Sequence, residues 1–131
     1  EFAKKLYVPG MTINKINKEA FMMMEKELVG LGLFTQEEAD NEDKTTFPLV
    51  RKYFMHNIGH FMGIDTHDVG DREVIFEEGM VATCEPGIYI PEEEIGVRIE
   101  TDILIAKNPI DLMADIPSQS DEIEKIMTKR K

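Results

Sequence analysis

The chain has 131 residues and a formal net charge of -11 at pH 7; 42% of its residues are hydrophobic and 31% are charged. This length and composition predict one soluble, globular domain with its own core. The acidic balance argues against a nucleic-acid partner, which requires clustered Lys and Arg, and no apolar run approaches the roughly 20 residues that span a membrane.

The first part of the chain has the pattern of helices and connections. Thr12 suits the N-cap of a helix whose apolar residues keep helical spacing to about Gly30. A polar and acidic connection follows at 35–46, and a short helix is expected within it at 36–39. An apolar and aromatic segment, 48–55, then leads into the histidine-bearing part of the chain.

The second part of the chain favours strands. Two apolar segments, 79–90 and 96–106, have the composition of strands and are joined by the short acidic loop 91–94. This spacing predicts an antiparallel hairpin. A last helix is expected through about Thr128, with a basic end that suits the helix dipole. No repeat or linker marks a second domain, so we expect one domain over residues 1–131.

The single cysteine and the first residue bear on the compartment of the protein and on where its chain starts. Cys84 is the only cysteine, so no intrachain disulfide is available. This favours a reducing compartment, and we expect a cytoplasmic protein in which Cys84 is a packed core thiol. The chain begins with Glu1 and has no secretory pattern, so we expect it to start inside a longer polypeptide or after processing.

Three histidines, the only ones in the chain, lie within twelve residues, and two carboxylates follow on the expected strands. The histidines are His56, His60 and His67, and the carboxylates are Glu85 and Glu100. A charge inside an apolar strand is costly to bury unless it is paired, and imidazole with carboxylate oxygens suits Mn, Zn or Fe. The residues alone leave two interpretations open, a divalent metal site or a hydrogen-bonded polar cluster.

Neighbouring residues add detail to both interpretations. Pro86 must distort the strand directly after Glu85, as happens where a side chain is aimed at a site. Glu100 has an alternative partner in Arg98, two residues away on the same strand. The aspartates on either side of His67 are either acceptors that orient imidazoles or solvated turn residues.

Four motifs follow one another in the second half of the chain. They are His56-x-x-x-His60-x-x-Gly63-x-Asp65-x-His67-Asp68-Val69-Gly70, Glu77-x-Gly79-Met80-Val81, Glu85-Pro86-Gly87-Ile88-Tyr89 and Gly96-Val97-Arg98-Ile99-Glu100. Together they resemble the C-terminal catalytic region of the Xaa-Pro aminopeptidases (aminopeptidase P) and prolidases. The resemblance implies the α+β pita-bread fold, here mostly its second half, with an antiparallel curved sheet and helices packed on one face. Residues 1–131 would then form a partial C-terminal peptidase domain.

The resemblance implies a metal-dependent hydrolase. His60 and Glu85 would bind one metal of a dinuclear centre, and Glu100 would bridge both metals. The cation expected is Mn²⁺, with Co²⁺ or Zn²⁺ as substitutes. The reaction would be two-metal hydrolysis of the amide bond that precedes proline in the second position of a peptide.

The same resemblance implies roles around the substrate. His56 would contact the bound peptide near its proline, and His67 would stabilise the tetrahedral intermediate. Glu85 would also carry the proton to the leaving nitrogen. Arg98 and Tyr89 match residues that support the substrate site. The catalytic residues implied are therefore His56, His67 and Glu85.

One departure from the family pattern limits what this chain does alone. The family site needs two further aspartates from a β-ribbon before the first helix, and the only aspartates before His56 are Asp40 and Asp43, in the polar connection. We therefore expect the isolated chain to bind at most one divalent metal, weakly, and not to be a competent peptidase. Exposed sheet edge and apolar surface would also allow it to form a homo-oligomer.

Other interpretations share parts of this pattern. The strongest alternative is a metal-deficient pita-bread module that binds peptides or proteins without cleaving them. Against it, all three residues implied as ligands within this chain are present. Methionine aminopeptidase and creatinase-like hydrolases share the fold. The run from His67 to Gly70, with Arg98 before Glu100, favours the proline-specific branch over methionine aminopeptidase, and the sequence gives creatinase-like hydrolases no specific support.

Overall fold

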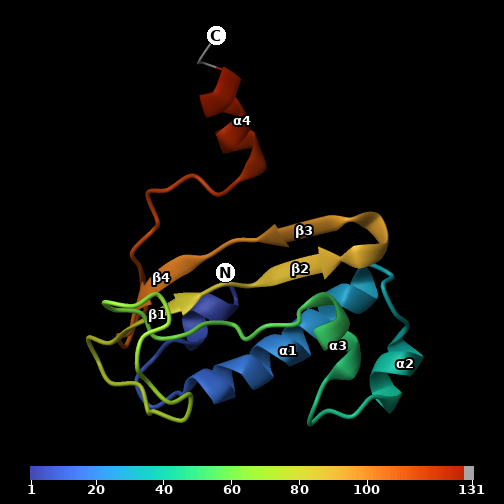
Figure 1. Ribbon diagram of the computed structural model, residues 1–131, viewed down its shortest axis with the longest axis horizontal. Coiled ribbons are helices and arrows are strands. Elements are labelled where there is room, and N and C mark those ends of the chain that lie inside the picture. The colour runs from blue at the N-terminus through green and yellow to red at the C-terminus, as the bar shows by residue number, and fades with distance from the viewer. Residues whose placement is uncertain (129–131) are drawn as a thin grey trace.

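In the computed structural model, which describes residues 1–128, the helices of the first 53 residues pack along one side of a long β-hairpin (Figure 1). In chain order the elements are a 3-10 helix η1 (Ala3–Leu6), α1 (Ile13–Gly30), α2 (Gln36–Asn41), α3 (Pro48–Tyr53), β1 (Val81–Cys84), β2 (Gly87–Ile90), a 3-10 helix η2 (Pro91–Glu93), β3 (Ile95–Arg98), β4 (Thr101–Leu104), β5 (Ile110–Asp111) and α4 (Ser120–Thr128). The arrangement confirms the expected α+β class. Within the described residues no helix has both the length and the apolar character that a bilayer crossing requires.

The helical predictions are confirmed, because local signals define these elements. Thr12 caps α1, and its hydroxyl accepts a hydrogen bond from the Lys15 N–H at 3.2 Å. Thr35 and Glu38 form a reciprocal capping box at the start of α2. The segment after the acidic connection adds a further short helix, α3, with Pro48 in its first turn.

The hairpin is antiparallel as predicted, and the distortion expected at Pro86 interrupts it. Each strand breaks in the middle, so that β1 pairs with β4 and β2 pairs with β3. Pro86 is the cause, because its carbonyl accepts from the Ile99 N–H at 3.2 Å but it has no N–H to return the second bond. The two strands keep the same pairing register on both sides of the break, so Glu85 lies opposite Glu100.

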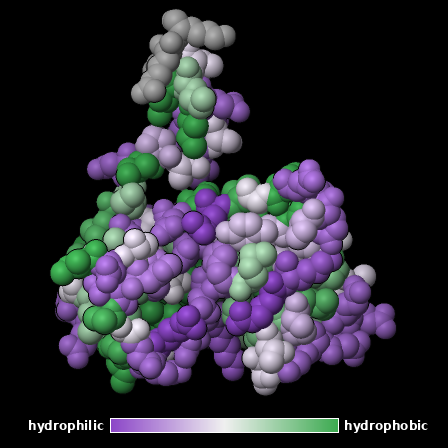
Figure 2. Space-filling view, in the orientation of Figure 1, coloured by the Kyte–Doolittle hydropathy of each residue, from purple (hydrophilic) through white to green (hydrophobic). Residues whose placement is uncertain are grey.

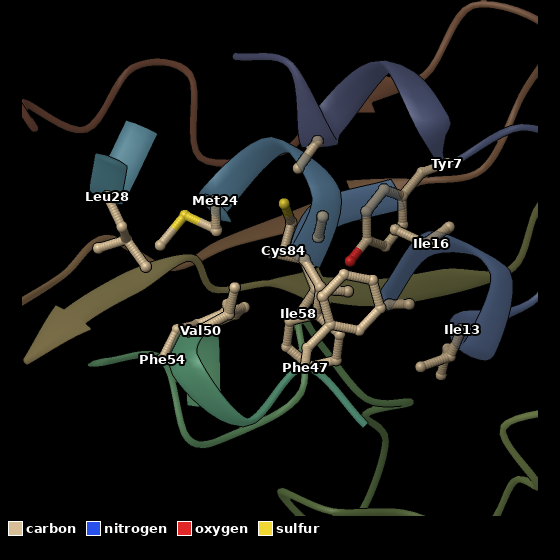
Figure 3. Close-up of a cluster of buried hydrophobic side chains, with 14 of the residues drawn as sticks. Tyr7, Ile13, Ile16, Met24, Leu28, Phe47, Val50, Phe54, Ile58 and Cys84 are labelled. Atoms are coloured by element: carbon tan, nitrogen blue, oxygen red, sulfur yellow. The ribbon is translucent and has the colours of Figure 1, made fainter. Parts of the chain in front are cut away.

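The core lies between the helices and the β1–β4 pair. Figure 3 shows side chains of α1, α3 and β1 meeting there, and Cys84 is among them with 1% of its surface exposed. This confirms the expectation of a packed thiol, and burial raises the pKa of Cys84 to about 11. Of the methionines in α1, Met24 is buried in this core while Met22 is 42% exposed.

The last helix confirms its prediction but contributes no buried residue. Figure 2 shows α4 standing clear of the body of the protein with hydrophobic side chains on its surface. Its Ile123, Ile126 and Met127 are 39%, 46% and 67% exposed. The basic end predicted for this helix, 129–131, lies outside the described residues.

The strand β3 also leaves apolar side chains in solvent. Ile95 and Val97 are 52% and 59% exposed, and Ile99 beyond the strand is 46% exposed. These residues form the kind of apolar surface on which the expectation of self-association rests.

A buried carboxylate links the end of α2 to the start of α3. The Glu42 side chain is 1% exposed, and its Oε2 accepts from the Leu49 N–H at 2.9 Å. Its Oε1 has no hydrogen-bond partner among the described residues and lies 3.8 Å from Lys44 Nζ. Burial, with the nearby Glu25 carboxylate, raises the pKa of Glu42 above its ordinary value.

This arrangement makes stability depend on pH. The folded chain holds a proton on Glu42 more tightly than the unfolded chain does, so Glu42 costs stability as pH rises from its unfolded pKa through its folded pKa. We expect Glu42→Gln to raise the free energy of unfolding by about 1 kcal/mol at pH 7. The gain should vanish near pH 4, where the carboxyl is protonated in both states. Urea denaturation at both pH values checks this, with the exposed Glu27→Gln as control, and an unchanged or lower stability of Glu42→Gln at pH 7 would contradict it.

Candidate metal and peptide site

The break in the hairpin places two carboxylates face to face. Glu85 and Glu100 occupy opposed positions, and like charges directly opposite on paired strands destabilise a sheet unless a cation lies between them. His60 completes the group. One ligand atom from each of these three side chains lies within 4.8 Å of the other two.

His60 lies on an irregular chain segment at the edge of the sheet, beside β1. Residues 58–61 run antiparallel to β1 on the side away from β4, and Phe61 forms a bridge with Ala82. The Glu85 N–H donates to the Ile58 carbonyl at 2.8 Å, and the Thr83 N–H donates to the His60 carbonyl at 2.9 Å. The imidazole therefore comes from a third chain segment beside the two that carry the carboxylates.

Hydrogen bonding also determines which imidazole nitrogen faces the carboxylates. His60 Nδ1 lies 2.9 Å from the Phe61 carbonyl oxygen, which only accepts, so Nδ1 carries the proton. The other nitrogen, Nε2, lies 3.5 Å from Glu85 Oε1. In the neutral imidazole a lone pair on Nε2 therefore points toward the carboxylates, as in histidines that bind metals.

The three histidines share one groove of about 430 Å³. The rings of His60 and His67 meet edge to face, with their centroids 4.3 Å apart. His56 Nδ1 donates to the Asn57 carbonyl at 2.8 Å, and its Nε2 accepts from the Tyr89 hydroxyl at 3.0 Å. His56 is thereby held in one tautomer, whereas His67 is exposed to solvent at the groove.

Arg98 lies between the two opposed carboxylates. Its Nε is 3.9 Å from Glu85 Oε2, and its Nη2 is 3.7 Å from Glu100 Oε2. The pairing of Arg98 with Glu100 that the sequence left open is therefore present together with the three-residue group. Both distances exceed hydrogen-bond length, and the Arg98 side chain is 48% exposed, so these ion pairs are weak.

The structure brings together every site residue named from the sequence. Five of them line the 430 Å³ groove, namely His56, His60, His67, Glu85 and Arg98. Glu100 borders an adjoining groove of about 670 Å³ that Arg98 also lines. Tyr89 does not line the first groove itself but is hydrogen-bonded to His56, which does.

The nearby aspartates have local roles. The Asp68 carboxylate accepts from the N–H groups of Ile64 and Val69 at 2.8 and 2.7 Å, which favours the turn interpretation. The N–H of Val69 contributes most to the lowered pKa of Asp68. Asp40 bonds Gln36 within α2, and Asp43 bonds its own loop, so neither replaces a missing ligand.

Sequence reasoning missed the residues that hold the histidine segment in place. Thr83 Oγ1 accepts from the His60 N–H at 3.0 Å, and Asn17 Oδ1 accepts from the Ile58 N–H at 2.7 Å. The signal for Thr83 was a polar residue two positions before Glu85 in an apolar strand. Asn17 had a comparable signal, because it interrupts the apolar pattern of α1 and is 5% exposed.

Comparison with known proteins places this geometry in a family. The model of metallopeptidase family M24 matches residues 2–107. Xaa-Pro aminopeptidase 3 of Homo sapiens is 35% identical over 136 residues, covering 95% of this chain and 26% of that protein. Xaa-Pro aminopeptidase of Escherichia coli (strain K12) is 38% identical over 140 residues, covering 97% of this chain and 31% of that protein.

Solved structures agree with the sequence matches. Zn-substituted E. coli aminopeptidase P in complex with product has a TM-score of 0.78 and 35% identity, and the match covers 99% of this chain and 32% of that one. E. coli aminopeptidase P with the inhibitor Pro-Leu has a TM-score of 0.77 and 35% identity, over 98% and 31%. The expected pita-bread fold is thus confirmed, although the chain spans only about a quarter to a third of the relatives described above. The match over residues 2–107 shows that this chain belongs to metallopeptidase family M24.

Proposed function

We propose that this chain carries part of the catalytic site of a metal-dependent aminopeptidase that cleaves the bond before proline in the second position of a peptide. The main support is that ligand atoms of His60, Glu85 and Glu100, one from each side chain, lie within 4.8 Å of one another. The relatives named Xaa-Pro aminopeptidase support the choice of substrate.

The donor set fits a divalent cation of the first transition row. His60 offers the lone pair of Nε2, and two carboxylates supply the charge that a dication needs. We expect Mn²⁺, with Co²⁺ or Zn²⁺ as substitutes. When bound, such a cation supplies Lewis-acid activation of water and of the scissile carbonyl.

We propose roles for the remaining site residues, supported by their positions. Glu85 is placed at the groove to accept a proton and return it to the leaving proline nitrogen. His67 is exposed beside His60 and would donate to the negatively charged oxygen of the intermediate. His56 has its orientation set by Tyr89 and would hold the peptide near its proline.

The metal site is tested by titrating Mn²⁺ into the 131-residue chain while the heat of binding is measured. We expect one weak site per chain, because this chain supplies one imidazole and two carboxylates to it. In Glu100→Gln the heat of binding should fall to background, since the opposed charge is gone. Two tightly bound Mn²⁺ per chain would refute the one-site expectation, and no binding at all would favour the metal-deficient module.

The reaction is tested by release of the first residue from an Xaa-Pro-Xaa peptide in excess Mn²⁺. We expect the 131-residue chain alone to show no turnover, because a two-metal site needs more ligands than this chain supplies. A longer protein that contains this chain should cleave the peptide, and Glu100→Gln should abolish that activity. Peptide binding without cleavage by the longer protein would favour the binding-module alternative.

A further inference from the structure

Thr83 holds the backbone of His60 at both its N–H and its carbonyl group. The Thr83 hydroxyl accepts from the His60 N–H at 3.0 Å and lies 3.4 Å from the His60 carbonyl oxygen. The Thr83 N–H donates to that same carbonyl at 2.9 Å. Thr83 is only 2% exposed, so water cannot replace its hydroxyl at the His60 N–H.

Tyr7 holds Thr83 in turn. The Tyr7 hydroxyl donates to the Thr83 carbonyl oxygen at 2.8 Å across 76 residues of sequence, and the whole tyrosine is buried. Its ring stacks on Phe76 with centroids 5.9 Å apart, which fixes where the hydroxyl points. A chain of hydrogen bonds therefore runs from Tyr7 through Thr83 to the backbone of His60.

This chain of hydrogen bonds bears on the chemistry of the imidazole. The bond from His60 Nδ1 to the Phe61 carbonyl exists only while the backbone at 60–61 keeps its present course. That bond keeps the proton on Nδ1 and leaves Nε2 free to face Glu85. Because Thr83 holds the backbone at this point, its hydroxyl helps decide which nitrogen faces the carboxylates.

We propose that Thr83 is a positioning residue for the metal site, acting through the backbone of His60 with Tyr7 as its support. The role rests on the proposed function, because it is defined by a cation at His60. Thr83 itself contributes no ligand atom to the group of three.

The test compares two substitutions at one position. Thr83→Val keeps a branched side chain but removes the hydroxyl, and Thr83→Ser keeps the hydroxyl. We expect Thr83→Val to weaken the affinity for Mn²⁺ by about tenfold or more, in the range measured for residues that orient metal ligands. Thr83→Ser should stay within about threefold of the wild type. Leu28→Ala, a truncation of a fully buried residue near the far end of α1 from Tyr7 (Figure 3), is the control for general destabilisation and should leave the affinity unchanged.

A second readout needs no metal. Long-range ¹⁵N–¹H spectra of the three histidines report the tautomer of each ring, and His60→Asn assigns the His60 signal. We expect His60 to be protonated on Nδ1 in the wild type and in Thr83→Ser, but to become a mixture of tautomers in Thr83→Val. If Thr83→Val does not fold, Tyr7→Phe keeps the ring stack and should show a smaller change in the same direction.

The two readouts separate failure of this proposal from failure of the proposed function. If the wild type does not bind Mn²⁺, the proposed function fails, while the tautomer of His60 still tests the positioning role. If Thr83→Val binds Mn²⁺ as tightly as the wild type and its His60 stays in the single Nδ1-protonated tautomer, the role proposed for Thr83 is overturned. Equal weakening in Thr83→Val and in the Leu28→Ala control would overturn it too, because the effect would then be one of stability.

Discussion

Replacing Glu85 with Gln should remove metal binding while leaving the fold intact. The substitution takes away one of the two opposed charges, and the affinity for Mn²⁺ should fall by more than about a hundredfold, beyond the 10–100-fold typical of residues that only orient ligands. Stability of the metal-free chain should change little, by about 0.5 kcal/mol at most. Loss of repulsion from Glu100 offsets loss of attraction to Arg98.

A neighbouring carboxylate gives a matched control for this substitution. Asp102→Asn removes the same charge two residues beyond Glu100 in the chain, outside the group of three. It should bind Mn²⁺ like the wild type. Calorimetric titration of both variants, with urea denaturation beside it, measures affinity and stability separately. Equal losses of affinity in the two variants would mean that net charge, not a ligand, governs cation binding.

Replacing Gly59 with Ala should destabilise the protein severely. A Cβ at this position would overlap the carbonyl oxygen of Thr83 and lie 2.8 Å from the Tyr7 hydroxyl. Neither group is free to move, because Thr83 is paired within the sheet and Tyr7 is fully buried. We expect a loss of about 3 kcal/mol or more in the free energy of unfolding, accompanied by weaker binding of Mn²⁺.

Gly30 provides the opposite case in the same chain. It ends α1 with ordinary backbone dihedral angles, and an added Cβ would meet no atom within 4 Å. Gly30→Ala should therefore stabilise the protein, by about 0.5–1 kcal/mol, by restricting the unfolded chain. Thermal or urea unfolding of the two variants should give shifts of opposite sign. A Gly59→Ala protein as stable as the wild type would show that β1 and the histidine segment can move apart.

The features that followed from the sequence depend on neighbours along the chain. The start of α1 at Thr12 needs only a hydroxyl and the N–H three residues later. The hairpin needs two apolar segments and a short turn. The seven site residues were found through their motifs and by resemblance to a family, and the structure places them around one pair of adjoining grooves.

The features that were missed depend on partners far apart in the chain. Nothing near residues 58–61 shows that this segment joins the edge of β1, since its partners lie more than twenty residues later. The hydroxyl of Tyr7 lies 76 residues before the carbonyl that it bonds. The strand breaks are an intermediate case. Pro86 was visible as a distortion after Glu85, but the break opposite it at Ile99 followed only once the register was known.

The unshifted register of the hairpin determines where this protein tolerates insertions. Glu85 and Glu100 lie equally far from the hairpin tip, residues 91–94, so residues added within the tip leave both strands in step. A single residue added to β2 alone would slide Glu85 out of opposition and turn the side chains between it and the tip to the other face. The tip is therefore the place in this hairpin where a foreign loop or an affinity tag can be spliced in with the two carboxylates still opposed.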